Sequence, residues 1–444
     1  MTQWQSLTKV QGAVVGAGNG ETPAADLQIE DRLHQRLIQE IDERGLRGLD
    51  KERAREQVER AARSMAAQAF PELVGDAKEE VVANVVNEVT GLGPIEPLLL
   101  DYSVSEVMVN APDQVYYERD GVIHKSSVAF RDEAHIYRIV ERIVAVLGRH
   151  VDEGSPLVDA RLQDGSRVNI IIPPLAPRSP TITIRKFRVD RYAMDDLIAI
   201  GTLSREMADF LGGCIKAKMN VVISGGSGSG KTTMLNAFSA FINNGERVVT
   251  VEDPIELRLQ QQHVVQLEAR PPSIEGKGEI GQRDLVRNAL RMRPDRIIVG
   301  EVRGAEAFDM MQAMNTGHEG SLTTVHANSP RDALARIENM TMMAGFDMPV
   351  RVVREQMASA LHVIVQLSRL VDGTRKIVQV TEVTGLEGSV VTLQDLYIYK
   401  QTGIEGGKAV GEMRATGLRP KFTERLQAYG VKLSENIFNT SRWG

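Results

Sequence analysis

Residues 225–232, Gly-Gly-Ser-Gly-Ser-Gly-Lys-Thr, have the residue types and the spacing of a phosphate-binding loop. The short β-branched run Asn220–Ser224 precedes them, and Thr233–Phe241, which has a helical composition, follows them. Glycines allow backbone N–H groups to close around phosphate oxygens, and the N-terminus of a helix adds partial positive charge. The sequence therefore predicts that this strand-to-helix turn binds a nucleoside triphosphate, with ATP as the expected ligand.

The positions of this loop take different parts in the predicted site. Lys231 is expected to reach the β- and γ-phosphates, and the Thr232 hydroxyl is expected to ligate Mg²⁺. A Gly/Ser linker that matches by chance is the alternative, and the flanking strand and helix argue against it. The residues predicted to hold the nucleotide are Gly225, Gly226, Ser227, Gly228, Ser229, Gly230, Lys231, Thr232 and Thr233.

Carboxylates stand where two apolar strands are expected to end. Glu301 follows the run Arg296–Gly300, and Glu252 with Asp253 follows a second β-branched run. Two adjacent carboxylates repel each other unless a cation lies near them, and a magnesium–nucleotide site supplies that cation. We therefore expect Glu252 and Glu301 to contact the metal or to orient and deprotonate water. The alternatives are a solvent-facing strand end for Glu301 and a plain acid-acid-Pro turn for Glu252.

Two histidines, His318 and His326, flank a short apolar run downstream of these acids. His326, at the end of that run, is expected to sense the γ-phosphate or to bridge to the carboxylates. A zinc pair is one alternative, but two histidines without a cysteine nearby are too few ligands. A histidine satisfied within the core is the other alternative.

Arginines upstream of the loop are candidates to complete the site. Arg167 and Arg185 lie in β-like segments, and Arg178 lies on a proline-rich loop between them. Arg303 is a further candidate because it follows Glu301 closely. An arginine that reaches the phosphates across a domain or subunit boundary accelerates hydrolysis by about 10³–10⁵. Each of these residues, taken singly, is more often a surface cation.

The composition describes a folded protein of a reducing compartment. Hydrophobic residues make up 42% of the 444 residues, and no apolar run reaches the length of a signal or transmembrane segment. The single Cys214 cannot form an internal disulfide. A net charge of −6 argues against extensive coating of nucleic acid. We therefore expect a soluble cytoplasmic protein with no nucleic-acid partner.

Strands and helices alternate after the phosphate loop, which predicts an α/β fold with a mostly parallel sheet and helices on both faces. A smaller α/β domain precedes it, and before that an N-terminal helical bundle, which is either an appendage or a partner-docking module. The predicted segments are a disordered N-terminus at 1–24, the helical bundle at 25–92, the small α/β domain at 93–190, a linker at 191–203, the phosphate-loop domain at 204–400 and a C-terminal tail at 401–444.

Four boxes together resemble those of the secretion-ATPase superfamily, which drives type II secretion, type IV pili, archaeal motility filaments and type IV secretion. The boxes are the phosphate loop at 225–232, the acidic box Val251–Pro254, the strand that ends at Glu301, and the histidine box Gly317–His326. Their combination is far more specific than any one of them.

Three stretches are similar to one branch of this superfamily, the CpaF-like ATPases of Tad (Flp) pili. They are Leu290–Arg303, Gly91–Leu98 and Gly165–Asn169. The resemblance spans roughly residues 80–400. The tetracysteine zinc element of some type II relatives is absent from the sequence, which argues against that branch.

The resemblance implies a RecA-like ATPase domain behind a smaller α/β domain, with nucleotide bound between the two domains, and a homohexameric ring. On this analogy Arg167 and Arg185 of the upstream domain contribute to the site, and Arg178 does so less directly. It also implies that hydrolysis moves one domain against the other. That motion is passed to an inner-membrane platform protein, so the motor itself is a peripheral membrane protein.

The function favoured is an ATPase that powers assembly or retraction of a Tad or type IV-like pilus. The motor of a related type II or type IV secretion system is the alternative. A RecA-like nucleic-acid motor is a third, against which the acidic balance and the lack of a basic and aromatic stripe argue. A nucleotide-gated scaffold that hydrolyses little is a fourth, against which the strand-end acids argue.

Overall fold

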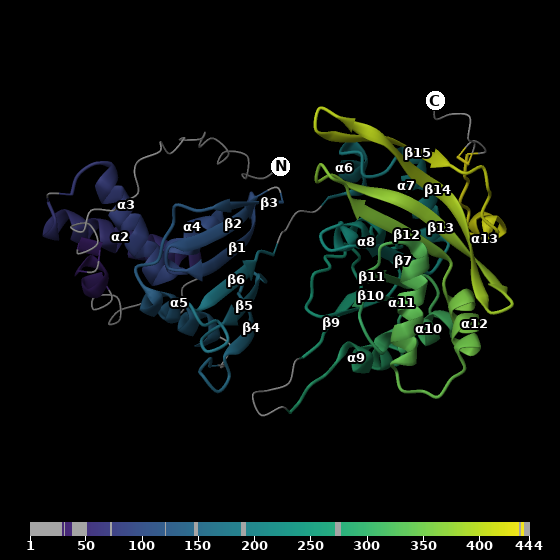
Figure 1. The fold of residues 1–444 in the computed structure, drawn as a ribbon, viewed down its shortest axis with the longest axis horizontal. Coiled ribbons are helices and arrows are strands. Elements are labelled where there is room, and N and C mark those ends of the chain that lie inside the picture. Colours follow the sequence, from purple (N-terminus) through teal and green to yellow (C-terminus); the bar gives the residue numbers. More distant parts are fainter. Residues whose placement is uncertain are drawn as a thin grey trace. The chain divides into compact units, whose positions relative to one another are not determined.

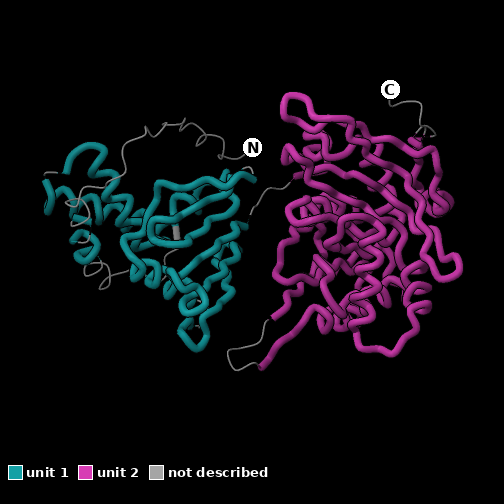
Figure 2. The backbone as a smooth tube through the Cα atoms, viewed as in Figure 1, with its two compact units in different colours: residues 1–188 teal, residues 189–444 magenta. Residues whose placement is uncertain are grey.

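The fold is given by a computed structural model (Figure 1). It forms two compact units, residues 1–188 and 189–444 (Figure 2). The predicted disordered segment 1–24 and the predicted domain boundary at 190 lie outside the described residues. The structure describes residues 29–30, 32–37, 51–71, 73–119, 121–145, 150–187, 192–270, 277–434 and 437–438.

Helices occupy the first part of unit 1. Residues 29–30 and 32–37 are helical, and they are followed by α2 (Lys51–Ala69) and α3 (Asp76–Thr90). Apolar side chains recur at helical spacing, so each helix presents one apolar stripe to the others. The shared core of these helices includes Leu33, Leu37, Val58, Ala62, Ala66, Val82, Val85 and Val86.

A fully antiparallel six-stranded sheet forms the rest of unit 1, in the order β3-β2-β1-β6-β5-β4. Helix α5 (Glu133–Ala145) packs Ile136 and Ile139 on one face of this sheet, against residues such as Val107 and Ile184. The short helices η1 (Gly93–Ile95) and α4 (Glu96–Leu100) lead into it. The strands are β1 (Val104–Ala111), β2 (Gln114–Arg119), β3 (Val122–Lys125), β4 (Leu157–Arg161), β5 (Arg167–Ile171) and β6 (Thr181–Arg185).

Unit 2 is built on a nine-stranded sheet in the order β15-β14-β13-β12-β7-β11-β10-β8-β9. Neighbours from β12 to β9 are parallel, and β13, β14 and β15 extend the sheet in antiparallel fashion. Strands β7, β8 and β11 are buried at every position, as strands covered on both faces must be. The strands are β7 (Val221–Gly225), β8 (Val248–Glu252), β9 (Val264–Glu268), β10 (Arg296–Val302), β11 (Leu322–Val325), β12 (Val363–Arg369), β13 (Arg375–Glu387), β14 (Val390–Glu405) and β15 (Lys408–Ala415).

Alternating residues of β7 show that helices cover both faces of this sheet. Val221 and Ile223 belong to one core, with α7 (Arg205–Lys216) and α8 (Lys231–Ser239). Val222 belongs to the other core, with the helices α9 (Gln282–Ala289), α10 (Glu306–Asn315), α11 (Pro330–Met342) and α12 (Val350–Ala360). The predicted α/β class, with a mostly parallel sheet between two layers of helices, is confirmed.

The predicted linker and tail are wrong in this structure, because both segments belong to the core of unit 2. Within 191–203, helix α6 (Met194–Ala199) buries Met194 and Leu197 against α7. Beyond residue 400, β14 continues to residue 405 and pairs with β15, so a stretch rich in Gly and charge is a hairpin. The phenol of Tyr397 donates to the Ile437 carbonyl at 2.9 Å.

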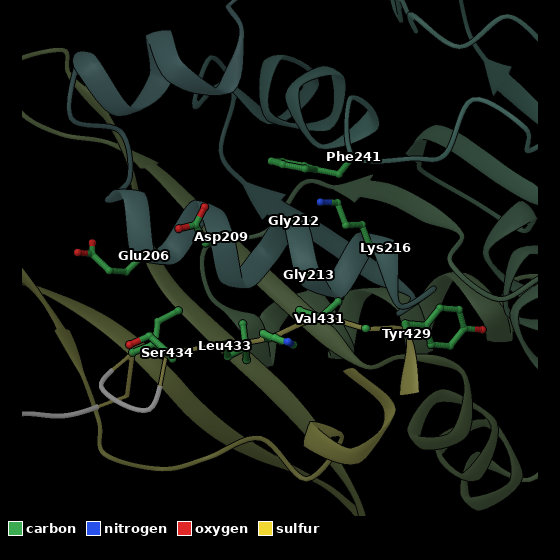
Figure 3. A pocket seen from close by; sticks show the side chains of 13 residues that line it. Glu206, Asp209, Gly212, Gly213, Lys216, Phe241, Tyr429, Val431, Leu433 and Ser434 are labelled. Atoms are coloured by element: carbon green, nitrogen blue, oxygen red, sulfur yellow. The ribbon is translucent and has the colours of Figure 1, made fainter. Parts of the chain in front are cut away.

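The C-terminal segment also packs against α7. A Cβ on Gly212 would lie 2.8 Å from the Phe241 ring, and one on Gly213 would lie 2.6 Å from a Val431 methyl. Two adjacent glycines therefore let both neighbours approach the helix backbone (Figure 3). The same residues border a cavity of about 480 Å³, whose rim also carries Glu206 of α7.

We predict that Phe438→Ala destabilises unit 2 by about 3 kcal/mol, because it removes a buried ring from the core. The Phe438 ring contacts Phe210 of α7 edge to face, with centroids 5.3 Å apart. Urea unfolding followed by circular dichroism measures the change. Leu418→Ala is the control, because Leu418 is 49% exposed and its loss should cost less than about 0.5 kcal/mol. Equal stability of Phe438→Ala and wild type would restore the tail as a separate appendage.

Candidate nucleotide-binding site

The parallel register of unit 2 brings four predicted boxes to one edge of the sheet. Ser224 of β7 stands beside Val325 of β11, and Val325 stands beside Val302 of β10. On the far side of β10, Val299 pairs with Val251 of β8. The phosphate loop, Glu252, Glu301 and His326 therefore lie at or just beyond the carboxyl ends of neighbouring strands. This edge is where ligands bind in open α/β sheets.

The loop after β7 needs glycine at several positions. Gly228 and Gly230 have φ angles of 66° and 96°, in the left-handed region that other residues rarely adopt. A Cβ on Gly225 would lie 2.4 Å from the Ser229 hydroxyl and 2.8 Å from the Leu367 carbonyl oxygen. The backbone can take this tight path only because those side chains are absent.

Helix α8 begins at Lys231, and its first turn contains the predicted site residues Lys231, Thr232 and Thr233. The Lys231 ammonium donates to the carbonyls of Gly225 and Gly226, at 3.1 and 3.0 Å. It therefore lies over the loop, where phosphate oxygens are expected to bind. The Thr232 hydroxyl lies 3.4 Å from a carboxylate oxygen of Glu256. Thr233 is half-buried beside it.

The two remaining loop residues differ in exposure. Ser227 is exposed at the tip of the loop. Ser229 is buried, and its hydroxyl donates to the Gly226 carbonyl at 2.9 Å. Ser229 therefore also stabilises the loop from within.

Glu252 holds the segment that follows β8. Its side chain is 2% exposed, and it accepts hydrogen bonds from the Thr250 hydroxyl at 2.9 Å and from two backbone amides. Those amides are from Glu256 and Leu257, each at 2.7 Å. Burial raises the pKa of the Glu252 carboxyl, and the three hydrogen bonds oppose that rise. Both oxygens are used within the protein, which differs from the metal contact expected for this residue.

Glu256 is a site residue that the sequence reasoning missed. It is the third acid of the segment that begins at Glu252, and it is the one whose carboxylate faces the Thr232 hydroxyl. Glu252 positions it, because the Glu252 carboxylate binds the Glu256 amide. The spacing of the acids gave no signal, since the backbone between them is irregular and the side-chain directions follow no simple period.

Glu301 lies at the carboxyl end of β10, as predicted, and is paired with Arg303. The guanidinium donates to one Glu301 oxygen from Nε at 2.9 Å and from Nη2 at 2.6 Å. Partial burial lowers the pKa of Arg303, but the bonds to Glu301 outweigh that effect and raise it. Asp253 and Glu256 act on Arg303 in the same direction. The Arg303 cation is therefore stabilised by Glu301 of β10 and by two carboxylates from the segment after β8.

The two histidines lie at opposite ends of β11. His326 follows the strand and His318 precedes it, and a strand of this length spans roughly 13 Å. They cannot share a zinc ion at that separation. Burial lowers the pKa of His326, and the positive charge of Lys231 lowers it further. His326 is therefore neutral at physiological pH and can donate or accept a hydrogen bond beside the phosphate loop.

The predicted arginines belong to unit 1. Arg167 of β5 stands directly opposite Arg185 of β6, so both side chains leave the same face of the sheet. Arg161 of β4 stands opposite Arg167, so three arginines lie side by side on adjacent strands. The sequence reasoning missed Arg161. Arg185 is 3.6 Å from the Glu106 carboxylate. Arg178 is exposed on the loop between β5 and β6.

None of the helices in the described part of the chain has the length and apolar character that crossing a lipid bilayer requires.

Comparison with known proteins gives a consistent result. The family described as type II/IV secretion system protein matches residues 88–420. A putative conjugal transfer protein of Mycobacterium tuberculosis is 37% identical over 327 residues, which are 72% of this chain and 92% of the relative. The type IV secretion system protein VirB11 of Bartonella quintana is 30% identical, over 68% of this chain and 93% of the relative.

Among solved structures, the VirB11 ATPase of the Brucella suis type IV secretion system is similar to this chain. It is 28% identical, with a TM-score of 0.36, over 65% of this chain and 91% of that one. The family match covers well over half of the chain and contains the phosphate loop, Glu252, Glu301 and His326. The chain therefore belongs to the type II/IV secretion system protein family.

Proposed function

We propose that this protein is an ATPase motor that hydrolyses ATP to ADP and phosphate at the carboxyl edge of the unit 2 sheet. The observation that carries the proposal is the parallel register that brings Lys231, Thr232, Glu301 and His326 to that edge. A binding loop alone would hold a nucleotide. Hydrolysis also needs a group that activates water and a group that contacts the γ-phosphate, and Glu301 and His326 are candidates for these two roles.

In the proposed mechanism, Lys231 leaves the loop carbonyls and binds the β- and γ-phosphate oxygens. The Thr232 hydroxyl would hold Mg²⁺, and the carboxylates of Glu256 and Glu301 would supply negative charge for it. Mg²⁺, when bound, neutralises the charge that develops on the transferred phosphate. Glu301 orients and deprotonates the attacking water. Glu252 supports the site through Glu256, and His326 contacts the γ-phosphate as a neutral group.

The open face of the unit 1 sheet supports a role for arginines from that unit. Arg167 and Arg185, with Arg161 beside them, form a row of cationic residues on adjacent strands, and guanidinium groups bind phosphate oxygens well. We propose that this row completes a nucleotide site in a homohexameric ring, and that Arg178 lies at its margin.

The machine that this motor drives is proposed to be a Tad or type IV-like pilus. The stretches Leu290–Arg303 and Gly91–Leu98 support it. The motor would act from the cytoplasm as a peripheral protein and pass its motion to an inner-membrane platform protein, with no nucleic-acid substrate. A type IV secretion or conjugation motor is the second candidate, which the names of the Mycobacterium and Bartonella relatives favour.

We predict that Glu301→Gln binds ATP with wild-type affinity and hydrolyses it about 10²–10⁴-fold more slowly, because the amide cannot accept the proton of water. Calorimetric titration and a phosphate-release assay measure the two quantities. Lys231→Ala should lose most nucleotide binding. Glu319→Gln is the control, because Glu319 precedes β11 at the opposite end from His326. Wild-type turnover by Glu301→Gln would remove Glu301 from the mechanism.

Glu252→Ala is expected to lower the free energy of unfolding by about 2–4 kcal/mol, because it leaves a buried hydroxyl, a buried amide and a partly buried amide without their acceptor. Glu301→Ala, at a partly exposed strand end, should change stability by less than about 1 kcal/mol. The free energies of unfolding of both variants, measured by chemical denaturation, distinguish a structural role of Glu252 from a catalytic one. Unchanged stability with abolished turnover in Glu252→Ala would instead make Glu252 a direct participant.

Arg185→Ala should reduce turnover by about 10³-fold while the ring stays intact, if its guanidinium stabilises charge on the phosphate. Mass photometry reports the oligomer, and phosphate release reports turnover. Arg63→Ala is the matched control, because Arg63 is exposed and pairs with Glu59 and Glu79 within the helical bundle. Disassembly of the ring by Arg185→Ala would assign Arg185 to the subunit interface.

A further inference from the structure

The hairpin of β12 and β13 runs beside the phosphate loop. β12 pairs with β7, and its Leu367 stands opposite Gly225, the first residue of the loop. Two positions further on, Arg369 faces Arg375 of β13 across the hairpin. Like charges directly opposite each other disfavour a strand pair. The placement of two arginines beside a phosphate-binding loop therefore suggests a role other than stabilising the hairpin.

Arg375 makes a direct contact with the loop. Its Nε donates to the Gly228 carbonyl oxygen at 2.8 Å, across 147 residues of sequence. Its aliphatic stem also lies against the loop, since a Cβ on Gly230 would be 3.4 Å from the Arg375 Cδ. Arg369 is nearby, with a guanidinium nitrogen 4.0 Å from the place that a Cβ would take on Gly228.

The contact fixes the orientation of one peptide plane. In a trans peptide the carbonyl oxygen and the next N–H point in opposite directions. Holding the Gly228 oxygen toward Arg375 therefore turns the Ser229 amide away from Arg375, toward the inside of the loop. That amide donates to the Gly226 carbonyl oxygen at 3.4 Å, and the Lys231 ammonium donates to the same oxygen. Gly228 needs such a restraint, because glycine adopts many other backbone conformations at little cost.

Asp372 anchors the hairpin that carries Arg375. Its carboxylate accepts hydrogen bonds from the Thr374 hydroxyl at 2.7 Å and from the Thr374 amide at 3.0 Å. Its second oxygen accepts from the Ala409 amide of β15 at 2.9 Å. These bonds, led by the one from Thr374, lower the pKa of Asp372 to about 2. The anchor therefore stays ionised at every pH at which the protein works.

We propose that Arg375 is a positioning residue of the nucleotide site. It holds the Gly228–Ser229 peptide so that the loop presents the Ser229 amide to the phosphates of a nucleoside triphosphate. Asp372 keeps the hairpin in place for this purpose by binding it to β15. The inference rests on the proposed function, because the ligand is the same triphosphate, and it adds to that site a residue from the antiparallel half of the sheet.

The test compares Arg375→Met with Lys376→Ala in the full-length chain. Methionine keeps an unbranched apolar stem and removes the Nε–H donor. Lys376 is the adjacent cation of β13, and its ammonium donates to the Gly201 carbonyl at 2.7 Å, so its loss removes the same charge from the same strand. Calorimetric titration with Mg²⁺ and a non-hydrolysable ATP analogue measures the dissociation constant, and phosphate release measures KM and kcat.

We expect Arg375→Met to weaken binding of the analogue and to raise KM by about tenfold each, the effect of one charge-assisted hydrogen bond. Its kcat at saturating ATP should stay within about threefold of wild type. Arg375→Lys keeps a cation, and its dissociation constant and KM should lie between those of wild type and those of Arg375→Met. Lys376→Ala should bind like wild type. If Arg375→Met does not fold, Arg375→Lys replaces it in the test. In that case the inference requires a measurable rise in the KM of Arg375→Lys.

Three results would overturn the inference. Wild-type affinity in Arg375→Met would show that the contact does not matter for binding. Equal weakening in Lys376→Ala would assign the effect to net charge. A loss of kcat with unchanged KM would give Arg375 a different role. Absence of binding by the wild-type chain would overturn the proposed function itself, an outcome distinct from these three.

Discussion

The parallel hydrogen bonding of β8, β10, β11 and β7 is the constraint on which the site depends. The phosphate loop, Glu252, Glu301 and His326 lie at or just beyond the carboxyl ends of these strands, and only the common direction of the strands brings those ends together. The register is fixed because β7, β8 and β11 are buried on both faces, so a shift of one residue would exchange the contents of two cores. Such a shift is costly, because Val221 and Ile223 pack into one core and Val222 packs into the other.

Within that frame, some polar side chains hold the backbone of the candidate site, and others remain available to the proposed ligand. Glu252 spends its carboxylate on Thr250 and on two amides, so it shapes the backbone that presents Glu256 to Thr232. Arg375, although exposed, also holds backbone of the site, since it donates to a carbonyl of the phosphate loop. Glu301 and His326 keep enough exposure to meet a ligand. The three hydrogen bonds that Glu252 accepts help to offset the cost of burying its carboxylate.

The sequence was sufficient to predict the parts of the site that depend on local pattern. The phosphate loop has a fixed spacing, and the apolar runs before Glu252, Glu301 and His326 are long enough to be strands. The sequence pattern gave no correct prediction where the periodicity is weak or where the contacting residues are far apart in the sequence. The segment beyond residue 400 is rich in glycine and charge, and it forms strands because the end of β14 and β15 pair with each other. Arg375 has no local signal, because its partner is 147 residues away.

The most direct measurement is an electron cryomicroscopy structure of the full chain with Mg²⁺ and a non-hydrolysable ATP analogue. We predict metal density at about 2.1 Å from the Thr232 hydroxyl oxygen. We also predict that the Lys231 ammonium leaves the Gly225 and Gly226 carbonyls for phosphate oxygens, with Glu301 facing the γ-phosphate. Nucleotide bound elsewhere, or Lys231 still on the loop carbonyls with the phosphates in place, would show that the proposed site is wrong.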